Sequence, residues 1–333
     1  MNEQMYAWTQ DGLSPREYIT RRDEEKRSIK RQSIRAGLCV IAFLILDYAA
    51  SFILVFSPLY TLYVQNETVK GLIEMGYYLL CMLVPFVVAF RTMRPEDRQM
   101  LTLFEKPVSK SAAVAAVFAG FLMCTAADYV TSVLVTILEN AGFSVEGGVY
   151  DTPVTGVSLV YSLLTIGILP AFVEEFALRG VIMQPLRRHG DRFAIVMSAC
   201  IFALMHGNLS QFSFAFIVGL AIGYFVVATG SVWVGVAIHM LNNTYSVVLN
   251  YLIEARPTAA EKMYNFELSF SLVFGILCFV LFLTVCRRNR LQKDPGVLTA
   301  GEKTAAYAFT LPMVIAVIAL IVKTVQLIHW SGV

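Results

Sequence analysis

Long hydrophobic runs separated by short polar segments dominate the chain. Nine such runs can be drawn, at approximately 36–60, 71–90, 111–138, 156–182, 193–208, 212–229, 231–252, 268–286 and 306–328. A helix of about 20 apolar residues crosses the roughly 30 Å hydrocarbon layer of a bilayer. The pattern therefore predicts an all-α, polytopic transmembrane bundle of about eight or nine spans. The fifth and sixth runs are short and nearly adjacent, which leaves a tight helical hairpin open as an alternative to two full crossings.

Composition agrees with this class. Of the 333 residues, 57% are hydrophobic and 15% are charged, against roughly 25% charged residues in soluble globular domains. The net charge of +2 is not drawn into a continuous basic stripe, so we expect a lipid bilayer and no nucleic acid as a partner. The six cysteines lie within or at the ends of apolar runs, with no spacing typical of a metal site or a disulfide framework.

The positions of Lys and Arg predict the topology, because loops on the cytoplasmic side carry an excess of these residues. Three loops are rich in them, at 91–110, 183–192 and 287–293, whereas the loop at 139–155 has none. If the spans alternate, all three basic loops lie on the side of the N-terminus. We therefore expect a multi-pass protein of the cell membrane with a cytoplasmic N-terminus, consisting of a polar arm at 1–35 and a transmembrane domain at 36–328.

Three polar motifs interrupt the hydrophobic runs. They are EEFALRG at 174–180, FALMH at 202–206 and HMLNN at 239–243. Ionisable side chains at membrane depth are costly, so they are read as a functional site by default. Counted from the basic loops and from the turn at 230–231, the motifs lie at similar depths of about 12 to 21 Å at 1.5 Å per residue.

Helical spacing indicates which of these groups can meet. Glu175 and Arg179 are four residues apart in the order that favours an ion pair. Glu174 points about 100° away from Glu175, so one carboxylate can be neutralised while the other stays free for chemistry. His239 and Asn243 share one helix face by the same rule.

Such a set is suited to hydrolysis of an acyl bond. A carboxylate and an imidazole, here Glu174 and His206, can bind and deprotonate a water molecule. A second imidazole and an amide, here His239 and Asn243, can donate hydrogen bonds to the oxyanion of a tetrahedral intermediate. The alternative for the two histidines is that they only join neighbouring membrane helices by hydrogen bonds.

The order EExxxR, FxxxH and HxxxN on successive apolar runs resembles the CPBP family of intramembrane proteases, the CAAX proteases and bacteriocin-processing enzymes, whose best-known type is the type II CAAX prenyl endopeptidase. The resemblance covers about 150–252 and implies a protease-like core of four helices. It implies that Glu174 and His206 activate water, and that His239 and Asn243 stabilise the oxyanion.

The same resemblance gives Glu175 and Arg179 a supporting role. Independently of it, we expect Phe202 to be a packing residue in support of the site. The resemblance implies an intramembrane endopeptidase acting on a membrane-associated or prenylated-type protein or peptide, with the cut near the cytoplasmic side. We expect no cofactor. A divalent metal such as zinc, in line with an earlier description of the family, is disfavoured because HExxH is absent and no separate carboxylate stands near either histidine.

Two other functions fit parts of the pattern. A secondary transporter would use buried Glu and His residues as ion sites, but it should show related halves and paired broken helices, and the sequence shows neither. A non-catalytic family member, acting in bacteriocin self-immunity or as a membrane scaffold, would keep the cavity without the chemistry. Other intramembrane protease classes fit less well, because GxSG and GxGD motifs are absent from the spans.

Several polar residues within the runs have no assigned role from sequence. Asp47, Glu74 and Asp128 could line a substrate cavity or join helices. Asn242 lies off the His239 face, so we expect it to bond to a neighbouring helix. Gly219 and Gly223 form a GxxxG motif, which favours close packing of two membrane helices.

Overall fold

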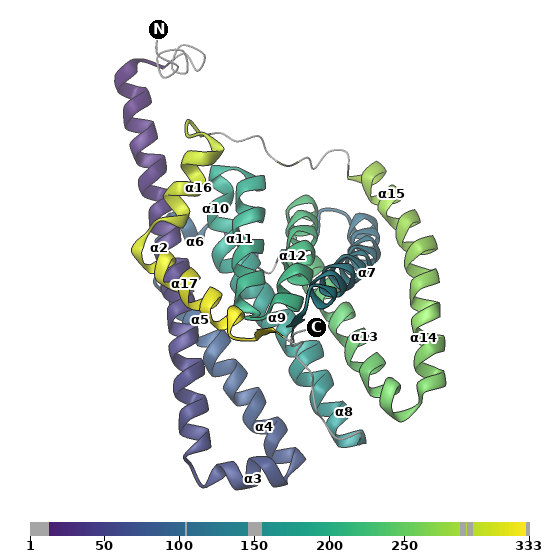
Figure 1. The fold of residues 1–333 in the computed structure, drawn as a ribbon. Helices are drawn as coiled ribbons and strands as arrows, with labels where there is room; N and C mark the ends of the chain where they lie inside the picture. Colours follow the sequence, from purple (N-terminus) through teal and green to yellow (C-terminus); the bar gives the residue numbers. More distant parts are fainter. Residues whose placement is uncertain (1–12, 104, 146–154, 287–290, 292–295, 331–333) are drawn as a thin grey trace.

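The computed structural model describes residues 13–103, 105–145, 155–286, 291 and 296–330, and it is almost entirely helical (Figure 1). The helical segments long and apolar enough to cross a membrane are Pro15–Val55 (α2), Glu67–Arg91 (α4, η1 and α5), Lys110–Asn140 (α7), Gly156–His189 (α8 to η4), Leu209–Thr229 (α12), Val232–Ala255 (α13) and Pro257–Val285 (α14, η5 and α15). The shorter elements are α3 (Leu59–Gln65), α6 (Pro95–Arg98), α11 (Asp191–Met205), α16 (Ala300–Ala308) and α17 (Leu311–Val325).

The all-α class and the membrane-spanning character are confirmed. The described residues contain seven such helices, or eight if the bent pair α16 and α17 counts as one span. Two strands of three residues each, β1 (Phe143–Val145) and β2 (Ile328–Trp330), pair antiparallel with Phe143 opposite Trp330.

The run at 193–208 became a short helix because α11 stops at a tight turn. At 15 residues it reaches about 22 Å. Gly207 then takes a positive φ of 69°, and the Asn208 side chain caps α12 by accepting from the Gln211 backbone N–H at 2.8 Å. The structure therefore contains the helical hairpin that the short runs left open.

The GxxxG motif lies at the contact between the two helices of this hairpin. A Cβ atom on Gly219 would lie 3.1 Å from Ala199 Cβ, and one on Gly223 would lie 3.0 Å from Ile195 Cγ2. Both distances are shorter than an ordinary van der Waals contact, so larger side chains would separate the helices. The close packing predicted from the motif is confirmed.

The run at 306–328 became two helices for a different reason. Helices α16 and α17 meet at an angle of 79°, and Pro312 lies in the first turn of α17. Proline has no N–H, so the Ala308 carbonyl has no helical partner at this position and a straight helix cannot continue through it.

The first helix begins with a sequence-encoded cap. The Ser14 hydroxyl accepts from the Glu17 backbone N–H, the Glu17 side chain bonds back to Ser14, and Pro15 takes the first helical position. Helix α2 then runs without a break to Val55. The division of the chain near residue 35 into an arm and a membrane domain stays a prediction, since no break in the helix marks it.

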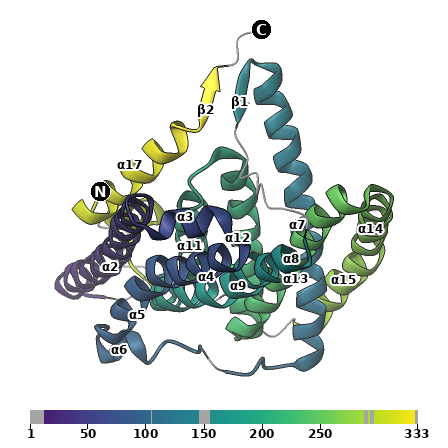
Figure 2. The same ribbon diagram turned by 90° about the horizontal axis from the view of Figure 1, so that it is seen from below.

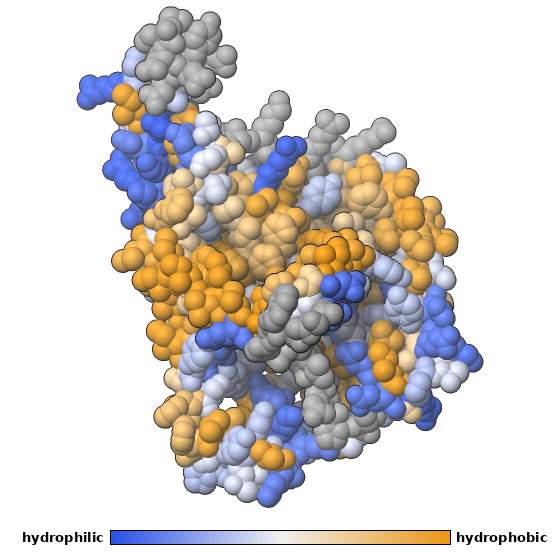
Figure 3. All heavy atoms as spheres, viewed as in Figure 1, coloured by the Kyte–Doolittle hydropathy of each residue, from blue (hydrophilic) through white to orange (hydrophobic). Residues whose placement is uncertain are grey.

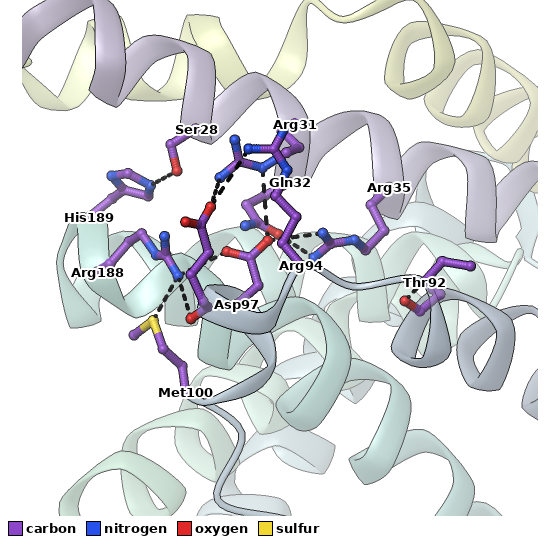
Figure 4. Close-up of polar contacts among 12 residues, drawn as sticks. Ser28, Arg31, Gln32, Arg35, Thr92, Arg94, Asp97, Met100, Arg188 and His189 are labelled. Atoms are coloured by element: carbon purple, nitrogen blue, oxygen red, sulfur yellow. Dashed lines mark hydrogen bonds and ion pairs between the residues drawn. The ribbon is translucent and has the colours of Figure 1, made fainter.

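An ion-pair network ties α2 to the loops at its own end of the molecule (Figure 4). The fully buried carboxylate of Asp97 on α6 meets Arg35 Nη2 at 2.9 Å, Arg188 Nη2 at 2.8 Å and Arg31 Nε at 3.8 Å. These four residues are called the Asp97 network below. Burial alone would raise the pKa of Asp97, but hydrogen bonds from Arg35 and Gln32 and the charges of Arg188 and Arg35 outweigh it, so this pKa lies below its ordinary value.

The helix ends divide into two groups on opposite sides of the molecule. The N-terminal end of α2 lies at the top of Figure 1, and α3, the starts of α4 and α8, and the turn between α13 and α14 lie at the bottom. Figure 3 shows hydrophilic atoms gathered at both ends and a largely hydrophobic belt between them. We call the top the N-terminal side and the bottom the far side.

Candidate active site

A cavity of about 880 Å³ receives five of the seven side chains that the sequence placed at the site. Glu174, His206, His239 and Asn243 all line it, as does Phe202. They come from three helical segments that pack together: α9 (Leu169–Glu174), the end of α11 and the middle of α13. The polar groups of three separate motifs thus share one space inside the bundle.

Glu174 is held at the junction of two kinds of helix. It ends α9, and the next residue begins the π-helix η3 (Glu175–Met183); π-helical turns are frequent at functional sites. Its Oε1 accepts a hydrogen bond from the Tyr78 hydroxyl at 2.8 Å, and its Oε2 lies 3.8 Å from His239 Nε2. The side chain is 16% exposed, so one carboxylate edge faces the cavity.

Glu175 is fully buried and contacts two other side chains of the site. Its Oε1 lies 3.2 Å from Arg179 Nη1 and 3.1 Å from His239 Nδ1. The ion pair expected from the spacing is therefore present, and the same oxygen also orients an imidazole. Arg179 in turn donates from Nη2 to the Gly219 carbonyl at 3.2 Å and lies over the Phe202 ring, 4.7 Å from its centroid.

His239 stands between the two adjacent carboxylates. Because a carboxylate only accepts hydrogen bonds, the bond to Glu175 places a proton on Nδ1 and leaves Nε2 facing Glu174. If Nε2 is also protonated, the charges of Glu174, Glu175, Arg179 and His239 balance to zero. A balanced group is far less costly to bury than a net charge.

His206 follows the last residue of α11 and is oriented by its own helix. Its Nδ1 lies 2.8 Å from the Phe202 carbonyl oxygen, and its ring meets the Phe202 ring edge-on. A carbonyl accepts, so Nδ1 donates this bond, and in the neutral ring Nε2 is then the acceptor. The Glu174 carboxylate has polar contacts with Tyr78 and His239, and the His206 ring has one with Phe202. Within the part of the chain that the structure describes, the two side chains are therefore not bonded directly to each other.

Asn243 makes a contact that the sequence alone did not indicate. Its Nδ2 donates to the Ile166 carbonyl at 3.0 Å. The regular helical partner of that carbonyl would be the N–H of residue 170, which is a proline and has none. Asn242 was expected to bond to a neighbouring helix; it donates instead to Asn243 Oδ1 at 3.2 Å and also lines the cavity.

Two residues of the site were missed by sequence reasoning. Tyr78 belongs to the second span, and a single Tyr in an apolar run carries little signal of a contact 96 residues away. Gly235 allows Glu175 to lie against α13, since a Cβ there would come within 2.7 Å of Glu175 Oε2. The sequence did contain a signal for Gly235, because a residue four positions before His239 lies on the same face of the helix.

The acidic residues without an assigned role divide into two environments. Glu74 and Asp128 line the cavity. Asp47 lies outside it, where its Oδ2 pairs with Lys323 Nζ at 2.9 Å and its Oδ1 accepts from the Tyr77 hydroxyl. Within the described ranges, no group of three or more His, Cys, Asp or Glu side chains is arranged to hold a metal ion.

The fold and cavity define an all-α, multi-pass membrane protein with a polar site inside its helices. Residues 156–245 match the family model described as Type II CAAX prenyl endopeptidase Rce1-like, which is a family of proteases. The match confirms the resemblance predicted from the three motifs and includes all four cavity residues named first above. Comparisons with curated proteins and with solved structures gave no match.

Proposed function

We propose that the chain is an intramembrane endopeptidase that hydrolyses a peptide bond of a membrane-associated protein or peptide with an activated water molecule. The observation that carries the proposal is the convergence of Glu174, His206, His239 and Asn243 on one cavity. The family match over the same segment supports it independently. The prenyl group of a CAAX-type substrate remains one of several substrate features that the site could accept.

Glu174 acts as the general base. Its Oε1 is held by Tyr78, so Oε2 is the oxygen presented to a water in the cavity. The basic Nε2 of His206 offers a second acceptor on the same cavity wall. One water, held by both acceptors at about 2.8 Å, loses a proton to Glu174 as it attacks the carbonyl carbon. That proton then passes to the leaving amine.

His239 and Asn243 stabilise the negative charge that forms on the carbonyl oxygen. Donors fixed in advance and aimed at the developing oxyanion act most strongly where water is excluded. Glu175 fixes the His239 ring through Nδ1, so Nε2 is the nitrogen left for this purpose, and it donates in the imidazolium form, with both ring nitrogens protonated. Asn243 has a second amide hydrogen beyond the one bonded to Ile166.

Glu175, Arg179 and Phe202 position these groups without touching the reacting atoms. Glu175 holds His239, Arg179 neutralises Glu175, and Phe202 lies between the Arg179 guanidinium and both imidazole rings. The Phe202 ring centroid is 4.8 Å from that of His206 and 5.9 Å from that of His239. The distance between the two histidines therefore depends on an aromatic spacer.

Cleavage by purified protein tests the proposal. Wild type in detergent or nanodiscs is incubated with a mixture of membrane-protein fragments and prenylated and unprenylated peptides, and new N-termini are identified by mass spectrometry. Glu174→Gln and His206→Ala should each reduce the new termini to a small residual fraction of the wild-type yield, while leaving expression and thermal stability intact. Glu254→Gln, a change at an exposed carboxylate near the end of α13, is the matched control.

The outcome separates catalysis from binding alone. Equal cleavage by Glu174→Gln would remove the proposed base. Capture of a peptide without any new N-terminus from wild type would favour the non-catalytic immunity or scaffold function. Retained cleavage in the presence of a strong chelator is expected, because water activation is assigned to side chains.

A further inference from the structure

The cavity is not a closed chamber around the four site residues. Its lining continues through Glu74 and Lys70 to Glu67 on α4, through Tyr161 to Ser158 on α8, and through Ser246 to Asn250 on α13. Glu67 and Ser158 lie in the first turns of their helices, and Asn250 lies near the end of its own. These are the ends gathered on the far side, where α4, α8 and α13 lie close together (Figure 2).

No corresponding passage reaches the N-terminal side through the described residues. The lining skips 79–127, 175–201 and 219–238, and these stretches contain the turns on that side. In place of a passage there is a tightly packed layer. Leu178, Met183 and Ile222 have no exposed surface, and Phe225 is 1% exposed.

The part of the cavity between the site residues and the far side is called the passage below. Its lining carries a net negative charge. Beyond the site residues its lining contains three carboxylates, Glu67, Glu74 and Asp128, and one ammonium group, Lys70. Glu67 accepts from the Thr155 hydroxyl at 2.7 Å and Glu74 from the Tyr63 hydroxyl at 3.1 Å. A cleft with walls of one sign raises the local concentration of the opposite charge, so this route favours cationic segments over anionic ones.

We propose that the substrate segment enters the cavity from the far side, opposite the N-terminus, and that an extended polar or cationic polypeptide is the occupant of the passage. Calling the occupant a substrate rests on the proposed function. The route itself follows from the cavity alone. A volume of about 880 Å³ is large for a ligand site, in keeping with a stretch of chain. If the N-terminus is cytoplasmic, the substrate is delivered from the other side of the membrane.

Cysteine accessibility in sealed vesicles tests the route. Ser246→Cys and Asn250→Cys place a thiol in the passage; Gln65→Cys on α3 marks the far side and Arg94→Cys, 61% exposed, marks the N-terminal side. Membrane-impermeant methanethiosulfonates are applied to vesicles of each orientation. The wild-type chain gives the background, because four of its six cysteines are buried.

Both passage thiols should react from the side that labels Gln65→Cys and be protected from the side that labels Arg94→Cys. A cationic reagent should react about tenfold or more faster than an anionic one of equal size, with no such preference at Gln65→Cys. Labelling from the Arg94→Cys side would overturn the proposal. So would labelling only by a membrane-permeant reagent, which would indicate entry from lipid.

The labelling does not depend on catalysis. Adding Glu174→Gln to each cysteine variant should leave the pattern unchanged, so an inactive protein can still confirm the route. Conversely, a protease labelled from the N-terminal side would keep the proposed function and lose the route. The two proposals therefore fail separately.

Discussion

At the residue scale, two adjacent carboxylates have been given different environments. Glu175 is fully buried and shares one oxygen between Arg179 and His239, whereas Glu174 is partly exposed to a polar cavity. Glu175 holds Arg179 and His239 in place. Glu174 keeps one oxygen at the cavity, which is the arrangement that the proposed general base requires.

Tyr78 is the residue whose removal tests this division most simply. Tyr78→Phe deletes the hydrogen bond to Glu174 Oε1, and a hydrogen bond to a charged group contributes about 1.5–3 kcal/mol. Because the bond holds Glu174 in the position from which it takes the proton, kcat should fall about tenfold to a hundredfold with KM little changed. Tyr161→Phe removes a hydroxyl from the same cavity but not from Glu174, and it should keep kcat. An unchanged kcat in Tyr78→Phe would show that Glu174 is positioned without it.

The motifs predicted which residues share the cavity, because helical spacing and depth both follow from a fixed rise per residue. They did not predict which residue contacts which. His239 lies beside Glu174 in the structure, while His206 bonds to its own helix. Such detail depends on the rotation of each helix and on distant residues such as Tyr78, and a single sequence encodes neither in a readable pattern.

At the element scale, the site depends on close approach of α13 to the segment that carries the two glutamates. Gly235 permits it, since a Cβ there would lie 2.7 Å from Glu175 Oε2 and 2.8 Å from Val226 Cγ2. The hairpin of α11 and α12 packs on the other side, where Arg179 bonds to the Gly219 carbonyl. Helices at such short distances leave no space for an added methyl group.

Substitution of this glycine should therefore affect both stability and activity. Gly235→Ala overpacks the contact, at a cost of about 1–3 kcal/mol, and displaces the Glu175 carboxylate that orients His239. We expect a lower unfolding temperature and a lower kcat. Gly76→Ala is the control, because a Cβ there meets nothing within 4 Å. A stable, fully active Gly235→Ala would contradict the close approach.

Sequence pattern was reliable for long elements and unreliable for short ones. The runs at 111–138 and 231–252 became helices with nearly those bounds, Lys110–Asn140 and Val232–Ala255. The last run was interrupted by Pro312 and the fifth by Gly207. Hydrophobicity measures how much apolar surface a segment carries, whereas its length as a helix is decided by local breakers within it.

At the scale of the whole molecule, the two sides are built differently. The N-terminal side is closed by packed side chains and by the Asp97 network, which joins α2, α6 and the 3-10 helix η4 (Arg187–His189). The far side receives the polar end of the cavity. The sequence indicated which loops are basic. A passage formed by the ends of three helices that are far apart along the chain leaves no local pattern in the sequence.

The Asp97 network gives a pH dependence with a definite sign. The pKa of Asp97 is lowered in the folded protein, so its stabilisation is present above the unfolded value of about 3.9 and is lost as pH falls below it. Asp97→Asn should lower the unfolding temperature at pH 7, since removing one partner of a buried ion pair costs about 3–5 kcal/mol. The gap to wild type should narrow as pH falls from 6 to about 3. A gap that stays constant with pH would exclude an electrostatic origin.

The central claim is that Glu174 and His206 act together on one water in a shared cavity. Single-turnover cleavage rates of Glu174→Gln, His206→Ala and the double variant test it most directly, because residues that act as a unit show losses far from additive. We predict that the double variant is no slower than the slower single variant. Losses that multiply would show two independent contributions and would contradict the claim.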